Sequence, residues 1–365
     1  MTIHFNRDTF LQVSQGQVVL WNVREHRQYS LDSSHTQRLI ELSLDRAALD
    51  ESNPIDVALL NAGAISRRPF PLTSWGWDAL ARIFHIGTSD IPQPPSPESS
   101  LQWATNNLSA CAEAARRPVP PPRDSNHGDI LPLPPPDMSR LHAAPLWKCC
   151  RTRATCREFI NQSTPLQDVS TVLYGALAFL AERTDKVHES VPASLRSRRS
   201  SPSGGGLNAS EAYVVLQNVN GIPPGLFHYN PTNHTLRRLT SELSRDWLSY
   251  ALSDQYFSRE LGFGVFFTGR LDRMWWKYPH SRAYRVSLLD IGHLSQTFLL
   301  CATACGLKTW LSGAFRDREV RAQLLIDDDG EQPLLFVGAG HGTGDELDPA
   351  RRAIVSRQPS TETLP

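Results

Sequence analysis

Two proline-dense stretches divide this chain and restrict its fold more than any other feature. They are IPQPPSP at residues 91–97 and RRPVPPPRDSNHGDILPLPPPD at residues 116–137. Because proline fixes φ and lacks a backbone N–H, neither stretch suits a helix interior or a central strand. We expect extended linkers or straps across a surface, with a short helix at residues 101–115 between them. The 365 residues leave room for a folded domain on each side.

The overall composition excludes several classes of protein. Lysine plus arginine equals aspartate plus glutamate at 37 each, so no net field draws the chain to nucleic acid or to a membrane. No apolar run is long enough for a membrane span, and the start, MTIHFNRDTFLQ, lacks a secretory signal pattern. The six cysteines fit neither CxxC pairs nor a zinc spacing, and Cys301 and Cys305 are expected to pack as core thiols. These features predict a reduced, soluble, cytoplasmic protein without a metal site.

Residues 1–90 predict a small winged-helix-like domain. VVLW and HRQYSL have the composition of two short strands around a polar turn, and Asp32 or Ser33 is placed to cap the helix that follows. That helix is expected to bury Leu39, Ile40 and Leu42. No helix face is rich in arginine or lysine, which argues against DNA binding. Two interpretations remain open: a packing domain, or a clamp whose exposed strand edge accepts an extended peptide.

From residue 148 onward, apolar strands alternate with helices. This order predicts an α+β fold in which helices cover a sheet. A helix over residues 283–305 is apolar nearly all round, so we expect it in a core or an interface, with His293 as a core histidine. An earlier helix is expected over residues 166–183, and a polar, frayed tail over residues 343–365. The expected strands are 212–217, 227–229, 236–239, 262–270, 307–315 and 333–340.

Lys277 and Tyr278 are the strongest candidates for catalysis. They follow Trp275 and Trp276 and precede the long helix, a setting that favours burial beside a ring-shaped ligand. Burial removes solvation from an ammonium group and favours the neutral amine, which makes a lysine usable as a base. At a surface the same two residues would be an ordinary polar pair, so the other motifs of the chain are needed to distinguish a reactive pair from a surface pair.

Two further motifs suit an anionic or flat ligand. A basic cluster precedes the helix expected at 166–183 and consists of Arg151, Arg153, Thr155 and Arg157. Guanidinium groups form bidentate bonds to phosphate, although a solvated basic turn has the same composition. The glycine loop at residues 203–206, Ser-Gly-Gly-Gly, lets backbone N–H groups approach a ligand closely. It lacks the lysine and the glycine spacing of the known nucleotide motifs.

Four stretches in this order resemble one family: RTRATCREF, PSGGGLNASEAYVV, WKYPHSRAYRVSLLDIGHLSQ and LSGAF. They are similar to the nitroreductase-like, FMN-dependent dehydrogenases that oxidise azolines to azoles in modified-peptide biosynthesis, the SagB-type or thiazole/oxazole-forming dehydrogenases. The resemblance covers residues 148–342, and HRQY with WGWDALARIFHIGT resembles the leader-binding extension of such enzymes. Together with the composition, it predicts a small winged-helix-like domain at 1–90, a proline-rich linker or strap with a short helix at 91–147, the dehydrogenase domain at 148–342 and a polar tail at 343–365.

The resemblance also implies a cofactor site. The fold would be the nitroreductase-like FMN-binding fold, a mixed and mainly antiparallel sheet flanked by helices, in a homodimer with FMN at the interface. By position, the ribityl phosphate would be held by Arg151, Arg153, Thr155 and Arg157. The isoalloxazine would be lined by Ser203, Gly204, Gly205 and Asn208, with Gly313 on its other side. Ala154 departs from the pattern at a position that is usually basic, and Pro279 replaces the usual glycine after the Lys-Tyr pair.

The activity implied is aromatisation of a thiazoline or oxazoline in a peptide, with a cyclodehydratase as partner. A base takes the ring Cα proton while a hydride leaves the adjacent carbon for flavin N5, and dioxygen is the expected acceptor. We expect Lys277 to be the base and Tyr278 the hydrogen-bond donor that holds it or the ring. Three alternatives remain: an NAD(P)H-dependent nitro or ene reductase of the same fold, an oxidase of carrier-tethered azolines in nonribosomal biosynthesis, and a non-catalytic scaffold that binds a precursor peptide.

Overall fold

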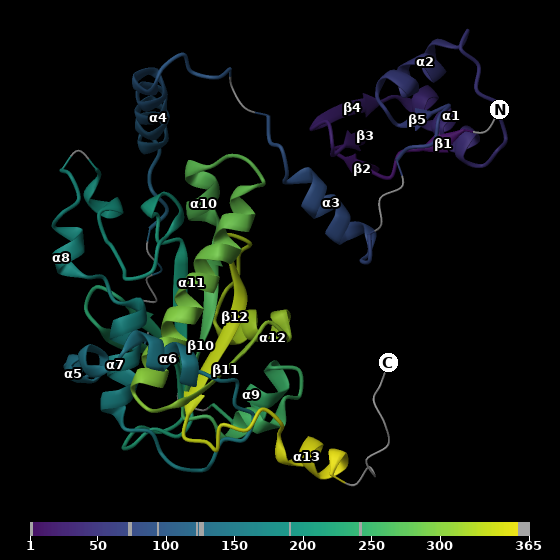
Figure 1. Ribbon diagram of the computed structural model, residues 1–365. Helices are drawn as coiled ribbons and strands as arrows, with labels where there is room; N and C mark the ends of the chain where they lie inside the picture. Colours follow the sequence, from purple (N-terminus) through teal and green to yellow (C-terminus); the bar gives the residue numbers. More distant parts are fainter. Residues whose placement is uncertain are drawn as a thin grey trace. The chain divides into compact units, whose positions relative to one another are not determined.

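The computed structural model describes residues 3–71, 75–92, 95–121, 123, 128–189, 191–240 and 243–356. The chain forms two compact units. One comprises Met1–Ala104 with His280–Arg282, and the other comprises Thr105–Pro279 with Ala283–Pro365. Figure 1 shows the elements of each unit. Parts of the expected strap and tail (residues 93–94, 122, 124–127 and 357–365) lie outside the described residues.

The smaller unit is built on a three-stranded antiparallel sheet with two helices packed on it. Its strands and helices are β1 His4–Phe5, β2 Thr9–Ser14, β3 Gln17–Asn22, β4 Arg27–Leu31, α1 Ser33–Ser43, α2 Pro54–Asn61, β5 Ile65–Ser66 and α3 Ala79–Gly87. Strands β2, β3 and β4 pair in that order, and β1 pairs with β5. Asp32 caps α1 by accepting a bond of 2.8 Å from the backbone N–H of His35. The small domain of strands and helices is therefore confirmed.

One core assignment in this unit was wrong. Leu39 and Leu42 are buried as expected, but Ile40 is 48% exposed. Leu39 and Leu42 are three positions apart and share one face of α1, whereas Ile40 lies about 100° around the helix from Leu39. The buried stripe of α1 is therefore narrower than the apolar pattern predicted.

The larger unit contains a seven-stranded sheet in the order β11-β12-β10-β7-β8-β9-β6. Every pairing between these strands is antiparallel, and isolated parallel bridges join the sheet to neighbouring loops. The strands are β6 Ile130–Pro132, β7 Ser210–Leu216, β8 Gly225–Asn230, β9 Thr235–Thr240, β10 Phe263–Arg270, β11 Lys308–Ser312 and β12 Glu331–Gly340. The sheet expected from the apolar runs is confirmed, and part of the second proline stretch adds the edge strand β6.

Helices cover both faces of this sheet (Figure 1). Helices α7 Leu166–Leu177 and α11 Ala283–Ala304 pack on one face, and α9 Arg245–Ala251 and α12 Asp317–Gln323 on the other. The other helices after α3 are α4 Ser100–Ala115, α5 Met138–Ala143, α6 Leu146–Thr152, α8 Ala181–Thr184, α10 Leu271–Lys277 and α13 Pro349–Val355. Alternate residues of β7 enter different cores, because side chains alternate across a strand. Val214 packs in the core with α7 and α11, and Val215 in the core with α9 and α12.

Three expectations about these helices need correction. The helix predicted over 166–183 ends at Leu177, because Phe179 and Leu180 donate their N–H groups to the carbonyls of Pro231 and Arg198. His293 on α11 is exposed and is not a core histidine. The tail is not frayed throughout, since Asp348 caps the helix α13.

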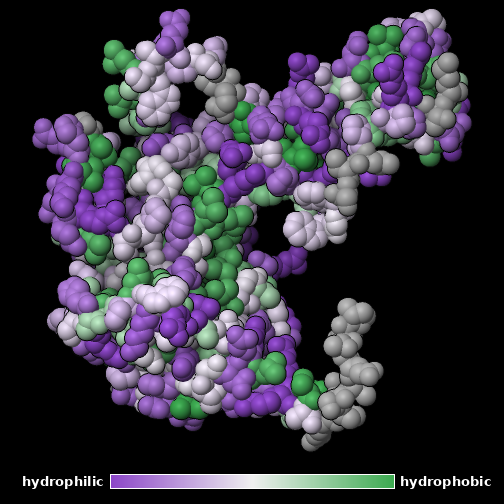
Figure 2. All heavy atoms as spheres, in the orientation of Figure 1, coloured by the Kyte–Doolittle hydropathy of each residue, from purple (hydrophilic) through white to green (hydrophobic). Residues whose placement is uncertain are grey.

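Helix α11 is buried on one face only. Its Ile291, Leu294 and Phe298 pack in the sheet core, whereas Leu288 is 42% and Leu289 is 61% exposed. Figure 2 shows hydrophobic surface in the region of α10 and α11. The nearly continuous apolar pattern of this helix therefore exceeds what the core of a single copy needs.

The cysteines and helices carry two further findings. All six cysteines are free thiols, and burial raises the pKa of Cys301 to about 12 and that of Cys305 to about 11. Within the described ranges, no three His, Cys, Asp or Glu side chains gather closely enough to hold a metal ion. In the same part of the chain, no helix has both the length and the apolar character that a membrane span requires.

Candidate functional site

The glycine loop and the Lys-Tyr pair lie against each other. Lys277 ends α10, and its Nζ donates to the carbonyl oxygen of Gly205 at 3.3 Å. A Cβ placed on Gly205 would lie 2.3 Å from Tyr278 Oη and 2.9 Å from Lys277 Nζ. Gly205 has φ +61°, a conformation that glycine adopts at little cost. The fold therefore brings together two motifs that are about seventy residues apart in the sequence.

Asp290 on α11 holds the glycine loop in place. Its carboxylate accepts from Ser203 Oγ at 2.9 Å and from the backbone N–H of Gly204 at 3.0 and 3.1 Å. The carboxyl is 5% exposed, and this burial raises its pKa even though the two donors act in the opposite direction. Sequence reasoning missed this residue, although a lone carboxylate on the buried face of an apolar helix was an available signal.

Asn208 is part of the framework of the loop. Its backbone N–H donates to Ser203 Oγ at 2.9 Å, and its side-chain amide donates to the carbonyl of Ser197 at 2.8 Å. Its φ of +46° is one that asparagine tolerates better than most residues. The structure therefore engages both donors of Asn208 within the protein.

The expected enclosure of Lys277 by two tryptophans is not found. Trp276 is 6% exposed, but Trp275 is 53% exposed and Lys277 itself is half-buried. Successive residues of a helix point about 100° apart, so neighbouring tryptophans on α10 cannot cover the same lysine. Lys277 faces the glycine loop and not a tryptophan cage.

The basic cluster lies beside the start of β11. Thr155 forms a parallel bridge with Thr309, and Cys156 N donates to the Thr309 carbonyl at 2.9 Å. Arg157 is engaged by the C-terminal segment, because its guanidinium donates to the Glu346 carbonyl at 2.9 Å. Arg151 is exposed and Arg153 half-buried, and among the described residues neither has a carboxylate within 4 Å.

A small cavity opens next to this cluster. Its volume is about 150 Å³, and it is lined by Thr152, Ala154, Thr303, Gly306, Leu307, Lys308 and Thr309. Lys308 places a cation beside Ala154, and no carboxylate of the described residues pairs with it. Sequence reasoning missed Lys308, because nothing in its strand indicated that it would lie next to the cluster.

The basic cluster and the glycine loop lie at opposite ends of the sheet. Thr309 is in register with Ala339, Phe263 and Leu216 across the strands, whereas the loop leads into Ser210 at the other end of β7. Six residues of strand correspond to about 20 Å. Within one copy, the two candidate ligand-binding motifs are thus separated along the whole length of β7.

Gly313 follows β11 and faces open space. No atom of the described chain lies within 4 Å of the place where its Cβ would be, and the residue is exposed. This differs from Gly264 in the sheet core, whose Cβ would lie 2.3 Å from the Phe336 ring. The surface at Gly313 can therefore accept a flat group without a clash.

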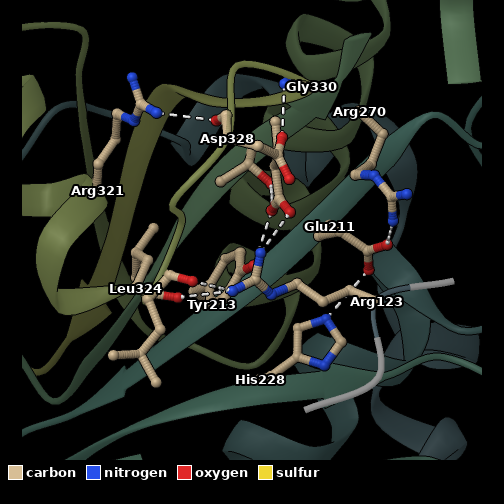
Figure 3. A network of polar contacts seen from close by, with 12 residues as sticks. Arg123, Glu211, Tyr213, His228, Arg270, Arg321, Leu324, Asp328 and Gly330 are labelled. Carbon is tan, nitrogen blue, oxygen red and sulfur yellow. Dashed lines mark hydrogen bonds and ion pairs between the residues drawn. The ribbon is translucent and has the colours of Figure 1, made fainter. Parts of the chain in front are cut away.

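A buried polar network lies at the glycine-loop end of the sheet (Figure 3). Glu211 pairs with His228 at 3.1 Å and with Arg270 at 3.2 Å. Burial raises the pKa of Glu211, but the bond from His228 and the nearby cations outweigh it and lower the pKa to about 2. Glu331 accepts from Tyr213 Oη at 2.7 Å. The network fixes β7, β8, β10 and β12 to one another below the site.

The larger unit has the α+β class that the sequence pattern predicted. In it, the glycine loop lies against the Lys277–Tyr278 pair. Residues 150–341 match the nitroreductase family, and the chain belongs to that family. Membership implies an oxidoreductase of the FMN-binding type. The nitroreductase-like fold expected from the sequence is thereby confirmed.

Curated relatives come from two kinds of system. A nitroreductase-type protein of Methanocaldococcus jannaschii is 28% identical over 213 residues, which cover 58% of this chain and 98% of that protein. The trifolitoxin-processing protein TfxB of Rhizobium leguminosarum bv. trifolii is 31% identical over 144 residues, 38% of either protein. The trifolitoxin operon protein TfxC of the same organism is 26% identical over 206 residues, 55% of this chain and 56% of that protein. The chain therefore spans about half or less of the two trifolitoxin proteins.

Proposed function

We propose that this protein is an FMN-dependent dehydrogenase that oxidises azoline rings of a peptide to azoles. The observation that carries the proposal is the Lys277–Tyr278 pair held against Gly205. Removal of the ring Cα proton requires a base beside the ring, and this pair offers one together with a hydrogen-bond donor. The likeness to a protein named for trifolitoxin processing supports a peptide substrate.

The chain's own residues divide the work of the reaction. Oxidation of an azoline removes two electrons and two protons. Lys277 takes the Cα proton at Nζ, and Tyr278 donates a hydrogen bond from Oη that holds either Lys277 or the ring. FMN, when bound, supplies the two-electron acceptor, with dioxygen as the final oxidant. The azoline ring would meet the pair beside Gly205, where Lys277 Nζ and Tyr278 Oη lie close together.

The cofactor residues proposed from the sequence fit FMN in part. Arg151, Arg153 and Thr155 remain available for the phosphate, whereas Arg157 is engaged with the Glu346 carbonyl and acts as a brace. We add Lys308, which places a cation at the cavity beside Ala154 and so offsets the missing basic residue. For the isoalloxazine we propose Ser203, Gly204 and Gly205 on one side and Gly313 on the other, with Asn208 bracing the loop.

The separation of the two motifs supports a homodimer with FMN at the interface. One copy carries the basic cluster and the glycine loop at opposite ends of β7, about 20 Å apart along the strand. A second copy related by a twofold axis can place its glycine loop near the first copy's basic cluster. The exposed Leu288 and Leu289 of α11 offer apolar surface for such an interface.

The decisive experiment uses the FMN-loaded full chain and a synthetic azoline peptide. We expect the peptide to lose the mass of two hydrogens per ring. Lys277→Ala should retain bound FMN but lose roughly 10²- to 10⁴-fold in turnover, the usual value of a general base. Lys186→Ala, at an exposed lysine, is the control and should keep the wild-type rate. Unchanged turnover in Lys277→Ala would sink the assignment.

A second candidate is supported by the relative from Methanocaldococcus jannaschii, which matches this chain over nearly its own full length. This second candidate function is the NAD(P)H-dependent reduction of nitro or enone compounds. Rapid bleaching of the flavin by NADPH in the absence of peptide would favour this activity. An azoline tethered to a carrier protein remains a variant substrate of the first proposal, and purified protein without flavin absorbance would instead indicate a peptide-binding scaffold.

We also propose that the smaller unit binds part of the peptide, next to a cyclodehydratase in the producing complex. β2 is an edge strand of its sheet, and it exposes Leu11 by 45% and Val13 by 78%. An extended peptide can add to such an edge, with pockets for alternate side chains. Val13→Asp should weaken binding of a labelled precursor peptide, and equal affinity for both proteins would refute the idea.

A further inference from the structure

The second proline-dense stretch, residues 116–137, is fastened to the helix that carries the proposed catalytic pair. Arg117 Nη2 donates to the carbonyl of Trp276, and the indole N–H of Trp276 donates back to the Arg117 carbonyl at 3.2 Å. Val119 packs on the small apolar cluster around Trp276, which also contains Leu207, Ala209, Met274 and Ala283. Residues 159 positions apart in sequence are thus joined by two reciprocal hydrogen bonds.

Two later residues of the same stretch, Pro121 and Arg123, contact the buried polar network. Arg270 Nη2 donates to the Pro121 carbonyl at 2.8 Å, and Arg123 Nη1 lies 3.0 Å from Glu331 Oε2. Arg123 also donates to the carbonyls of Leu324 and Leu325 (Figure 3). From here on, the strap means only the part of this stretch formed by residues 116–121 and 123. It is held by Trp276 near the end of α10, by Arg270 directly before the start of α10, and by Glu331.

Helix α10 depends on such a support. It has seven residues, and a helix this short is unstable without tertiary contacts. The carbonyls of its last turn lack partners within the helix. Tyr278 N–H satisfies the Met274 carbonyl at 2.8 Å, and Arg117 satisfies that of Trp276. Lys277 directly follows Trp276 and is the last residue of α10. The contact of Arg117 with the Trp276 carbonyl therefore restricts the position of the Lys277 backbone, from which the side chain reaches Gly205.

We propose that Arg117 is a positioning residue for the catalytic pair. By binding the Trp276 carbonyl, it fixes the end of α10 so that Lys277 and Tyr278 remain against Gly205. The inference rests on the proposed function in giving that pair its catalytic role. The strap is therefore a working part of the oxidoreductase unit as well as a connection in the chain.

The test compares neighbouring arginines in the FMN-loaded full chain. Arg117→Ala removes the bond to Trp276, whereas Arg116→Ala alters a side chain that is 77% exposed and, among the described residues, forms an ion pair with Glu113 alone. We expect Arg117→Ala to lower kcat for the azoline peptide about 10- to 100-fold, as a small misplacement of reacting groups does. The KM for peptide and the Kd for FMN should stay within about twofold, since the proposed binding residues of both ligands do not include Arg117. Arg117→Lys should recover part of kcat, because an ammonium can still donate to the carbonyl.

Hydrogen exchange provides a second readout that needs no substrate. Arg117→Ala should speed deuterium uptake at residues 271–278 and leave β10 unchanged, while Arg116→Ala changes neither. Equal kcat and equal exchange in the two variants would overturn the proposal. Absence of azoline oxidation in the wild-type protein would refute the proposed function instead, and the exchange result would then decide on the strap alone. If Arg117→Ala does not fold, Arg117→Met, which keeps an apolar chain of similar length but cannot donate to the Trp276 carbonyl, decides on the same measurements.

Discussion

Gly205 offers a way to displace Lys277 and Tyr278, the proposed catalytic pair, without damaging the fold. An alanine there would place its Cβ 2.3 Å from Tyr278 Oη and 2.9 Å from Lys277 Nζ, closer than non-bonded atoms can approach. Both atoms are the far ends of flexible side chains, so they can move aside at little cost in stability. The backbone cost of a non-glycine residue at φ +61° is about 1–2 kcal/mol. Stability should thus fall modestly while the pair leaves its place.

Gly221 is a matched control for the backbone term. Its φ is +73°, and no atom lies within 4 Å of the place of its Cβ. Gly221→Ala therefore carries the same strain of about 1–2 kcal/mol and displaces nothing. The difference between the two variants isolates the effect on Lys277 and Tyr278.

The assay combines urea unfolding with turnover of the azoline peptide. We expect similar losses of unfolding free energy in Gly205→Ala and Gly221→Ala. Turnover should fall about 10²-fold in Gly205→Ala alone, because reacting groups displaced by about 1 Å lose that much. Wild-type turnover in Gly205→Ala, or an equal loss of turnover in both variants, would show that contact with the glycine loop does not set the position of the pair.

Two further predictions concern the cofactor and the buried network. Lys308→Ala should weaken FMN binding roughly tenfold, as measured by quenching of flavin fluorescence. Binding of riboflavin, which lacks the phosphate, should be unaffected. Equal weakening of both ligands would show that Lys308 does not bind the phosphate. For Glu211, a pKa lowered from 4.5 to about 2 means that its stabilisation is complete above pH 4.5 and is lost as the pH falls toward 2. Glu211→Gln should cost about 3 kcal/mol at pH 7 and much less at pH 2 in urea unfolding, and a cost independent of pH would contradict this.

Local patterns in the sequence were sufficient for the main strands and the long helix of the larger unit. The strand over 262–270 and the helix over 283–305 appear within one residue of their expected ends. Their apolar runs and turn residues act within a few positions, so no knowledge of the fold is needed to interpret them. The same holds for the cap of α1 at Asp32.

Burial of single side chains was less predictable. Ile40 and His293 were expected inside, and both are exposed, whereas Leu289 was expected in a core or an interface and is exposed in the single chain. Periodicity tells which residues share a face of a helix, but not how wide a stripe the neighbouring elements cover. For α11, that width depends on the sheet and on the absence of a second layer over Leu289 among the described residues of this chain.

The sequence by itself determined the α+β class, the site motifs and the candidate pair Lys277–Tyr278. Only the tertiary structure decided how these parts are held: Asp290 under the glycine loop, Arg117 on the end of α10, and Lys308 beside Ala154. It also placed the basic cluster and the glycine loop at opposite ends of β7. These are contacts between residues far apart in the chain, and they follow from the order in which strands pair, which no local pattern encodes.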